Sequence, residues 1–170
     1  MKLSAETLNR VREIFFLSSN RKKFASEDER DDFFKTWTDY YFKFCPELIL
    51  FDHDGAKIRG YLMGCADSAS AELFYRDRLK SYAVFANLFS RFPGHLHINV
   101  HPDGRSQGVG ARLIAQFEEI LKKRGVRGLH IVTSPESANT AFYLRNGFSY
   151  KEIRDWQNHS LLFMGKTLTV

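Results

Sequence analysis

The fold is decided by one stretch of the chain, which reads Ile98-Asn99-Val100-His101-Pro102-Asp103-Gly104-Arg105-Ser106-Gln107-Gly108-Val109-Gly110-Ala111. The pattern predicts a strand from His95 to Val100 and an amphipathic helix from Gly108 to Arg124. Between them, Gly108 and Gly110 lack the Cβ atoms that would keep a ligand away from the backbone. The N–H groups of a helix's first turn are unpaired and favour negative charge. The stretch therefore predicts a pyrophosphate cradle, with the positive charge of Arg105 at its rim.

Two other phosphate-binding loops fit this stretch poorly. A nucleoside triphosphate loop requires Gly-Lys followed by Ser or Thr, which is missing here. The dinucleotide fingerprint requires a further glycine where Leu113 stands. A lone Gly-x-Gly before a helix is also compatible with a simple tight turn, so the interpretation depends on a second motif.

The second motif reads Asn139-Thr140-Ala141-Phe142-Tyr143-Leu144-Arg145-Asn146-Gly147-Phe148. The two blocks together resemble the GNAT superfamily of N-acetyltransferases. The first matches its Arg/Gln-x-x-Gly-x-Gly/Ala loop, and the second its Tyr-x-x-x-Gly-Phe helix end. The resemblance extends from Leu48 to the C-terminus. It implies a single GNAT-like acetyltransferase domain over residues 1–170, of the α/β (α+β) class, with a mixed central sheet flanked by helices.

A finer resemblance concerns residues 94–100, Gly-His-Leu-His-Ile-Asn-Val. This segment is similar to the stand-alone bacterial relatives of the acetyltransferase-like domain of O-GlcNAcases. In the family's fuller helix pattern, an asparagine stands where this chain has Glu136, and an alanine stands where it has Asn139.

The family resemblance implies acetyl-coenzyme A as the co-substrate. The strand from His95 to Val100 is expected to splay from the one at Leu129 to Thr133, so that pantetheine can lie along it as an added strand would. The pyrophosphate is expected on the backbone of the loop. The expected cofactor-binding residues are Ile98, Asn99, Val100, Arg105, Ser106, Gln107, Gly108, Val109, Gly110, Ala111, Asn139, Phe142 and Tyr143.

The implied chemistry is direct attack of a primary amine on the thioester, with a backbone N–H stabilising the oxyanion. Tyr143 matches the tyrosine that protonates the departing thiolate as a general acid. His95, His97 and Asn99 alternate along one strand and so share a face. His97 is the candidate proton relay, with a structural histidine bonded to a backbone carbonyl as the alternative. Asn99 cannot act as a base and would orient the substrate. His95 and His97 have no identifiable third ligand, so we expect no metal.

The rest of the chain predicts elements around these motifs. Ser4 and Ser26-Glu27-Asp28-Glu29 are typical helix starts, and the second helix ends at Cys45-Pro46. Residues 48–51 and 58–64 predict two strands joined by a turn at Asp52-His53-Asp54-Gly55. A helical pattern with Leu73 and Phe74 among its apolar positions follows, and Ser137 to Asn146 predicts a short helix. We expect the acceptor pocket among residues of these segments, namely Phe24, Trp37, Tyr40, Tyr41, Asp67, Phe74 and Tyr75.

Composition excludes several classes of function. The formal net charge of +5 suits an anionic ligand, but it is spread along the chain, which disfavours a nucleic-acid-binding surface. No apolar run is long enough to cross a membrane, and the start lacks a signal peptide, so a cytoplasmic protein is expected. Two cysteines are too few for a disulfide scaffold. A homodimer, formed for example through a strand at Leu161 to Met164, stays open. The alternative function is a non-catalytic acyl-coenzyme A-binding regulatory domain.

Overall fold

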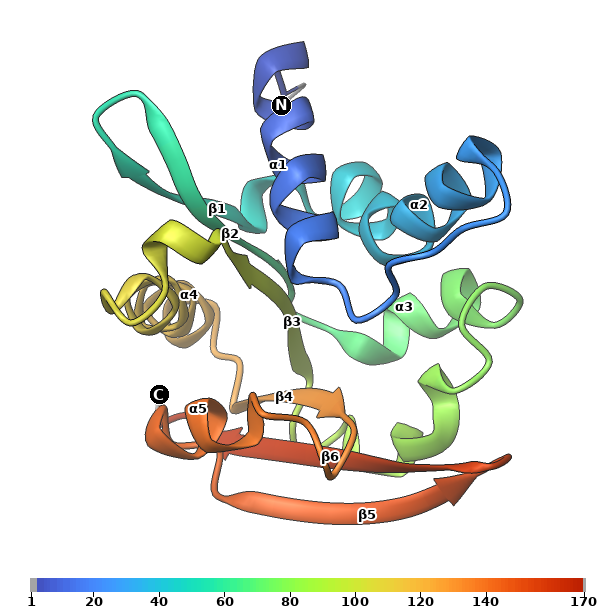
Figure 1. Cartoon of the computed structure of the whole chain (residues 1–170). Coiled ribbons are helices and arrows are strands. Elements are labelled where there is room, and N and C mark those ends of the chain that lie inside the picture. Colours follow the sequence, from blue (N-terminus) through green and yellow to red (C-terminus); the bar gives the residue numbers. More distant parts are fainter. Residues whose placement is uncertain (1–2, 170) are drawn as a thin grey trace. The chain divides into compact units, whose positions relative to one another are not determined.

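A computed structural model describes residues 3–169, and within them the chain forms two compact units. Unit 1 comprises the residues up to Gly64 and His97–Phe117, and unit 2 comprises Cys65–Leu96 and the residues from Glu118 on. The elements, drawn in Figure 1, are α1 (Ala5–Ser18), α2 (Glu27–Phe44), η1 (Pro46–Leu48), β1 (Ile49–Asp54), β2 (Lys57–Cys65), α3 (Ser68–Tyr75), η2 (Tyr82–Leu88), β3 (Gly94–Val100), η3 (Pro102–Gly104), α4 (Val109–Lys123), β4 (Gly128–Thr133), α5 (Thr140–Arg145), β5 (Tyr150–Trp156) and β6 (His159–Thr167).

The strands of residues 3–169 form one mixed sheet in the order β1-β2-β3-β4-β6-β5. The β3–β4 pair is parallel, whereas β1–β2, β4–β6 and β5–β6 are antiparallel. This confirms the predicted class, a mixed sheet flanked by helices.

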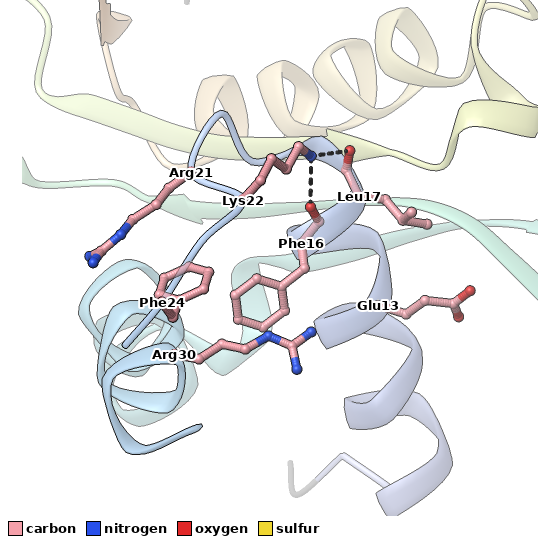
Figure 2. Close-up of a pocket in the computed structure, with 7 residues that line it drawn as sticks. All are labelled: Glu13, Phe16, Leu17, Arg21, Lys22, Phe24 and Arg30. Carbon is pink, nitrogen blue, oxygen red and sulfur yellow. Dashed lines mark hydrogen bonds between the residues drawn. The ribbon is translucent and has the colours of Figure 1, made fainter. Parts of the chain in front are cut away.

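The first two helices begin where the sequence predicts. The Ser4 side chain accepts a hydrogen bond from the N–H of Thr7, and the Ser26 side chain accepts one from the N–H of Glu29. The return half of the second capping box is shifted by one residue, because Glu29 accepts from the N–H of Ala25. These bonds satisfy some of the N–H groups that a helix start leaves unpaired. At the other end of α1, Lys22 Nζ donates to the carbonyls of Phe16 and Leu17 (Figure 2).

In unit 1 the two faces of β2 contact different helices. On one face, Gly60 and Gly64 lie against α4: a Cβ added to Gly64 would come within 2.2 Å of the Phe117 ring. On the other face, the Tyr61 hydroxyl lies beside His97, whose ring also packs against α1 and α2. The glycines let α4 approach the strands closely and leave the opposite face for polar and aromatic side chains.

Unit 2 has its own aromatic core. Phe85, Leu88, Phe92 and Phe163 form a buried cluster, against which Tyr150 also packs. Figure 1 shows β5 running alongside β6 in this unit, and Gly165 of β6 leaves room for the Phe92 ring. This core packs η2 against β6. The β4 and β6 strands pair over six residues.

Several predicted boundaries are wrong in detail. The hairpin turn is Gly55-Ala56, because Asp52 to Asp54 continue β1 through a bulge. The helical pattern after residue 66 forms two short helices, α3 and η2, and Leu73 is exposed while Ala71 and Tyr75 are buried. The helix predicted from Ser137 begins at Thr140.

The strand at Leu161 to Met164 is not open for pairing with a second copy. It lies within β6, whose residues hydrogen-bond to β5 on one side and to β4 on the other. The backbone groups of this segment are already used within the sheet, so a homodimer, which stays open, would need another surface. Both cysteines are buried, as predicted. In the part of the chain described, no helix combines the length and the apolar character required to span a bilayer.

Candidate active site

The predicted cradle is a loop that enters α4 within unit 1. It follows η3, where the Gly104 N–H donates to the His101 carbonyl at 2.9 Å. Ser106 and Gly108 then adopt left-handed conformations, with φ of 60° and 74°. The first N–H donation to a helix carbonyl is that of Arg112 to Gly108, at 3.0 Å. The N–H groups before Arg112 have no helix carbonyl one turn earlier to which they could donate. They are therefore available to an anion.

A carboxylate in β1 holds this loop in place. Asp52 accepts hydrogen bonds from the guanidinium groups of Arg59, at 2.7 Å, and Arg112, at 2.9 Å. Arg112 also donates to the Gln107 carbonyl at 2.9 Å, which anchors the loop to its own helix. Burial by itself raises the pKa of Asp52, but the hydrogen bonds from Arg112 and Arg59 outweigh it and hold the pKa below its ordinary value.

The pH dependence of stability should report this network. Because the folded-state pKa of Asp52 is depressed, its contribution is present above the unfolded-state pKa, about 3.9, and is lost as the pH falls through the folded value. We expect Asp52→Asn to lower the free energy of unfolding by about 1–3 kcal/mol at pH 7, with the difference shrinking below about pH 4.

Urea unfolding from pH 3 to 7 measures that difference, with Asp54→Asn as the matched control. Asp54 is 74% exposed at 3.7 Å from Arg59, so its substitution should change stability little. A loss for Asp52→Asn that is independent of pH would show that the carboxylate's charge is not what stabilises the loop.

The β3 backbone leads into the cradle. Its pairing with β4 covers Gly94↔Leu129 and His95↔His130 only. Further along, the Val100 carbonyl accepts hydrogen bonds from Ser18 Oγ at 3.3 Å and from Arg105 Nε at 3.4 Å. The His101 N–H donates to the backbone carbonyl of Arg59 at 2.8 Å. The printed β3–β4 pairs thus end at His95, and the expected splay of the two strands stays a prediction.

His97 and Asn99 are brought together, and Tyr61 of β2 joins them. Asn99 Nδ2 lies 2.8 Å from the Tyr61 hydroxyl and 3.0 Å from His97 Nε2, and that hydroxyl lies 3.2 Å from the same Nε2. The Trp37 ring stacks on His97 with centroids 6.3 Å apart, and Phe15 lies at 5.7 Å. Burial lowers the pKa of His97 to about 4, so the ring is neutral near pH 7.

His95 does not join this cluster, although alternation along the strand predicts a shared face. In unit 2 its Nδ1 lies 2.7 Å from Ser68 Oγ, which itself donates to the Pro93 carbonyl. Burial, with a smaller effect from neighbouring His130, holds the pKa of His95 well below its ordinary value. His95 is therefore a structural histidine of the unit 2 core.

The second motif lies in unit 2, on α5. Tyr143 is 7% exposed, and its ring packs against Phe142 and Phe148. Among residues 3–169 its hydroxyl makes no hydrogen bond, and burial raises its pKa above the ordinary value, so it stays protonated. Asn139 precedes the helix and accepts from the Thr133 hydroxyl at 3.2 Å. Gly147, at φ 85°, ends the motif as predicted.

A partly buried ion pair fixes the end of this motif. Lys166 of β6 donates to Glu118 at 2.5 Å and to the Asn146 carbonyl at 2.9 Å. A Cβ at Gly147 would lie 3.0 Å from the Lys166 side chain. The lysine therefore connects α4, β6 and the turn after Tyr143 inside unit 2.

Sequence reasoning missed Tyr61, Asp52 and Arg112. No local motif marks them, because each acts through a partner from a distant segment: Arg112 and Asp52 are 60 residues apart, and Tyr61 and His97 are 36 apart. Only a correct pairing of β2 with β3 and α4 would have identified them. The described residues contain no group of three or more His, Cys, Asp or Glu side chains that could hold a metal ion.

A mixed sheet with this strand–loop–helix cradle defines the acyl-coenzyme A N-acyltransferase fold. The chain belongs to the GNAT acetyltransferase family, because the family profile described as "Acetyltransferase (GNAT) domain" matches residues 48–150.

Solved structures agree with this fold. The crystal structure of SsHAT is 22% identical, with a TM-score of 0.76, and the match covers 100% of this chain and 98% of that one. The ribosomal-protein-S18-alanine N-acetyltransferase from Escherichia coli is 17% identical, with a TM-score of 0.62 and coverage of 100% and 93%. PH1933 from Pyrococcus horikoshii OT3 is 15% identical, with a TM-score of 0.71 and coverage of 100% and 96%.

The family membership supports acetyl transfer as the chemistry of this chain and implies acetyl-coenzyme A as the co-substrate. The resemblance to the GNAT superfamily is thereby confirmed. The finer similarity to O-GlcNAcase-related enzymes and the single-domain organisation stay predictions, as do the individual site residues.

Proposed function

We propose that this protein is an acetyl-coenzyme A-dependent N-acetyltransferase that acetylates a primary amine by direct attack. The observation that carries this proposal is the cradle, in which left-handed Ser106 and Gly108 lead into the first turn of α4. Its outward N–H groups, the helix dipole and the Arg105 side chain suit a pyrophosphate. The coenzyme, when bound, supplies an acetyl group activated as a thioester.

Ile98, Asn99 and Val100 are proposed to bind the pantetheine arm through their backbone, because pairing with β4 ends before them. A backbone N–H of this segment would stabilise the developing oxyanion. Arg105, Ser106, Gln107, Gly108, Val109, Gly110 and Ala111 would hold the pyrophosphate, and Asn139 and Phe142 would contact the arm. The chemistry of these residues suits the coenzyme, because small or flexible side chains surround the backbone N–H donors and the Arg105 cation lies at the rim.

Tyr143 is proposed as the general acid. Its hydroxyl is protonated at neutral pH, because burial raises its pKa. It is buried and makes no hydrogen bond within residues 3–169, so its proton is not committed to another group. A hydroxyl in this state can donate to a thiolate as the thiolate leaves.

His97 is proposed as a relay for the proton that the amine loses. With its pKa lowered to about 4, it cannot strip a free ammonium ion: against a lysine-like pKa of about 10.4, the transfer would cost about 9 kcal/mol. The attacking nitrogen becomes far more acidic once it bonds the acetyl carbon. A neutral imidazole can accept the proton at that stage and pass it to water.

Incubating the full-length protein with acetyl-coenzyme A and a panel of amines tests this function. The panel should contain small amines, amino sugars, and peptides with a free N-terminus or lysine. We expect stoichiometric release of coenzyme A thiol and acetylated product by mass spectrometry. Tight binding of acetyl-coenzyme A without turnover on any amine would instead favour the non-catalytic regulatory alternative.

A further inference from the structure

Tyr61, Asn99 and His97 form a small polar cluster enclosed by aromatic rings in unit 1. Tyr61 has no exposed surface, and its hydroxyl has only Asn99 and His97 as partners among the described residues. Phe15 from α1, Trp37 from α2 and Tyr61 from β2 pack around the imidazole. Among residues 3–169, Tyr61 is the titratable side chain that packs against this ring. Burial, partly offset by the Asn99 hydrogen bond, raises the pKa of Tyr61 and keeps it protonated.

Counting donors and acceptors decides how this cluster is arranged. With the Asn99 amide nitrogen toward its neighbours, one hydrogen goes to the Tyr61 oxygen and the other to His97 Nε2. The Tyr61 hydrogen then competes with that amide hydrogen for one acceptor, because Nε2 has a single lone pair, and one of the two is left without a partner in the cluster. An unsatisfied hydroxyl hydrogen at a fully buried residue is costly.

Turning the amide by 180° exchanges its oxygen and nitrogen at nearly the same positions. The oxygen has two lone pairs, so it accepts from the Tyr61 hydroxyl and from a proton on His97 Nε2 together. The Tyr61 hydroxyl, the Asn99 oxygen and the His97 Nε2–H then each have a hydrogen-bond partner within the cluster. A neutral imidazole with its proton on Nε2 keeps its lone pair on Nδ1.

Nδ1 is the ring atom that remains available. It makes no hydrogen bond within residues 3–169, and the His97 side chain keeps part of its surface exposed. We propose that Asn99 and Tyr61 are positioning residues, which hold the proton of His97 on Nε2 so that Nδ1 accepts the proton of the attacking amine. In that step an N–H bond of the amine breaks, its electron pair stays on nitrogen, and the proton binds Nδ1.

The inference deepens the proposed function and rests on it, but its first test needs no turnover. Nitrogen-15 spectra of histidine-labelled, full-length protein distinguish the two tautomers, and His97→Gln assigns the signal. We expect His97 in the free protein to carry its proton on Nε2. A signal from a ring protonated on Nδ1 would overturn the proposal, even if the enzyme acetylates amines.

Two variants separate the roles of the neighbours. Tyr61→Phe removes the hydroxyl hydrogen that fixes the orientation of the Asn99 amide, so the Nδ1-protonated tautomer of His97 should become populated. An unchanged spectrum would rule out a role for Tyr61. Asn99→Asp keeps an acceptor and adds a negative charge, which should raise the pKa of His97 by about 1–3 pH units. Asn158→Asp places the same charge in the exposed turn after β5 and should leave the His97 titration unchanged.

The activity readout then links the cluster to the reaction. For Asn99→Asp, the acid limb of the kcat/KM profile should move to higher pH by the same amount as the His97 titration in the spectra. If the spectra shift and the profile does not, His97 is a structural histidine and not the relay. If no amine is acetylated by any variant, the tautomer result still stands and the proposed function fails alone.

Discussion

Gly108→Val is expected to abolish acetyl-coenzyme A binding. Gly108 lies at φ 74° at the entrance to α4, and an added Cβ would meet Arg112 at 3.2 Å. A branched side chain there strains the backbone and covers the N–H groups that we propose bind the pyrophosphate. Losing two charge-assisted hydrogen bonds, at about 1.5–3 kcal/mol each, weakens binding by at least about 100-fold. Isothermal titration calorimetry with acetyl-coenzyme A measures the change.

The chain offers a matched control in Gly125→Val. Gly125 has φ 72°, nearly the same conformation, and no atom lies within 4 Å of an added Cβ. Both variants should lose about 1–3 kcal/mol of stability through backbone strain, but only the first should lose the ligand. Equal binding by the two variants would show that the loop is a tight turn with no part in coenzyme recognition.

Tyr143→Phe has the second largest expected effect. Removing the proposed general acid should lower the single-turnover rate by about 100- to 1,000-fold, within the range of such catalysis, while the Kd for acetyl-coenzyme A stays the same. Stability should not fall, since the hydroxyl makes no hydrogen bond within residues 3–169. Rapid-quench measurement of acetylated product gives the rate.

Tyr82→Phe serves as the comparison. Tyr82 is also a tyrosine of unit 2 whose pKa is raised, chiefly by burial, but its hydroxyl donates to the Ser68 carbonyl at 2.9 Å. Its loss should cost about 1 kcal/mol of stability and leave the rate unchanged. A wild-type rate for Tyr143→Phe across the pH range would eliminate the tyrosine as the acid.

The parts of the site that could be predicted from the sequence are those encoded over a few consecutive residues. The Arg105-x-x-Gly108-x-Gly110 loop and the helix after it depend on local conformation, and the left-handed Gly108 confirms the turn. The caps at Ser4 and Ser26 are local for the same reason.

The parts that could not be predicted depend on pairing between distant segments. Alternation placed His95 beside His97, yet His95 is bonded to Ser68, because α3 and the loop before β3 pack over that end of the strand. Tyr61 lies in a strand whose sequence gives no sign of its neighbours. The exposed Leu73 shows the same limit, since hydrophobicity alone did not tell which face of α3 would be covered.

The position of β5 at the end of the strand order bears on how the protein behaves at high concentration. Among the strands of residues 3–169, β5 has a hydrogen-bonded neighbour, β6, on one side only. It carries four charges in seven residues, in Lys151, Glu152, Arg154 and Asp155. Charged side chains on an outer strand oppose edge-to-edge association and the fibrous aggregates that can grow from it. The charges of β5 therefore guard one of the two outer strands of this sheet against such association.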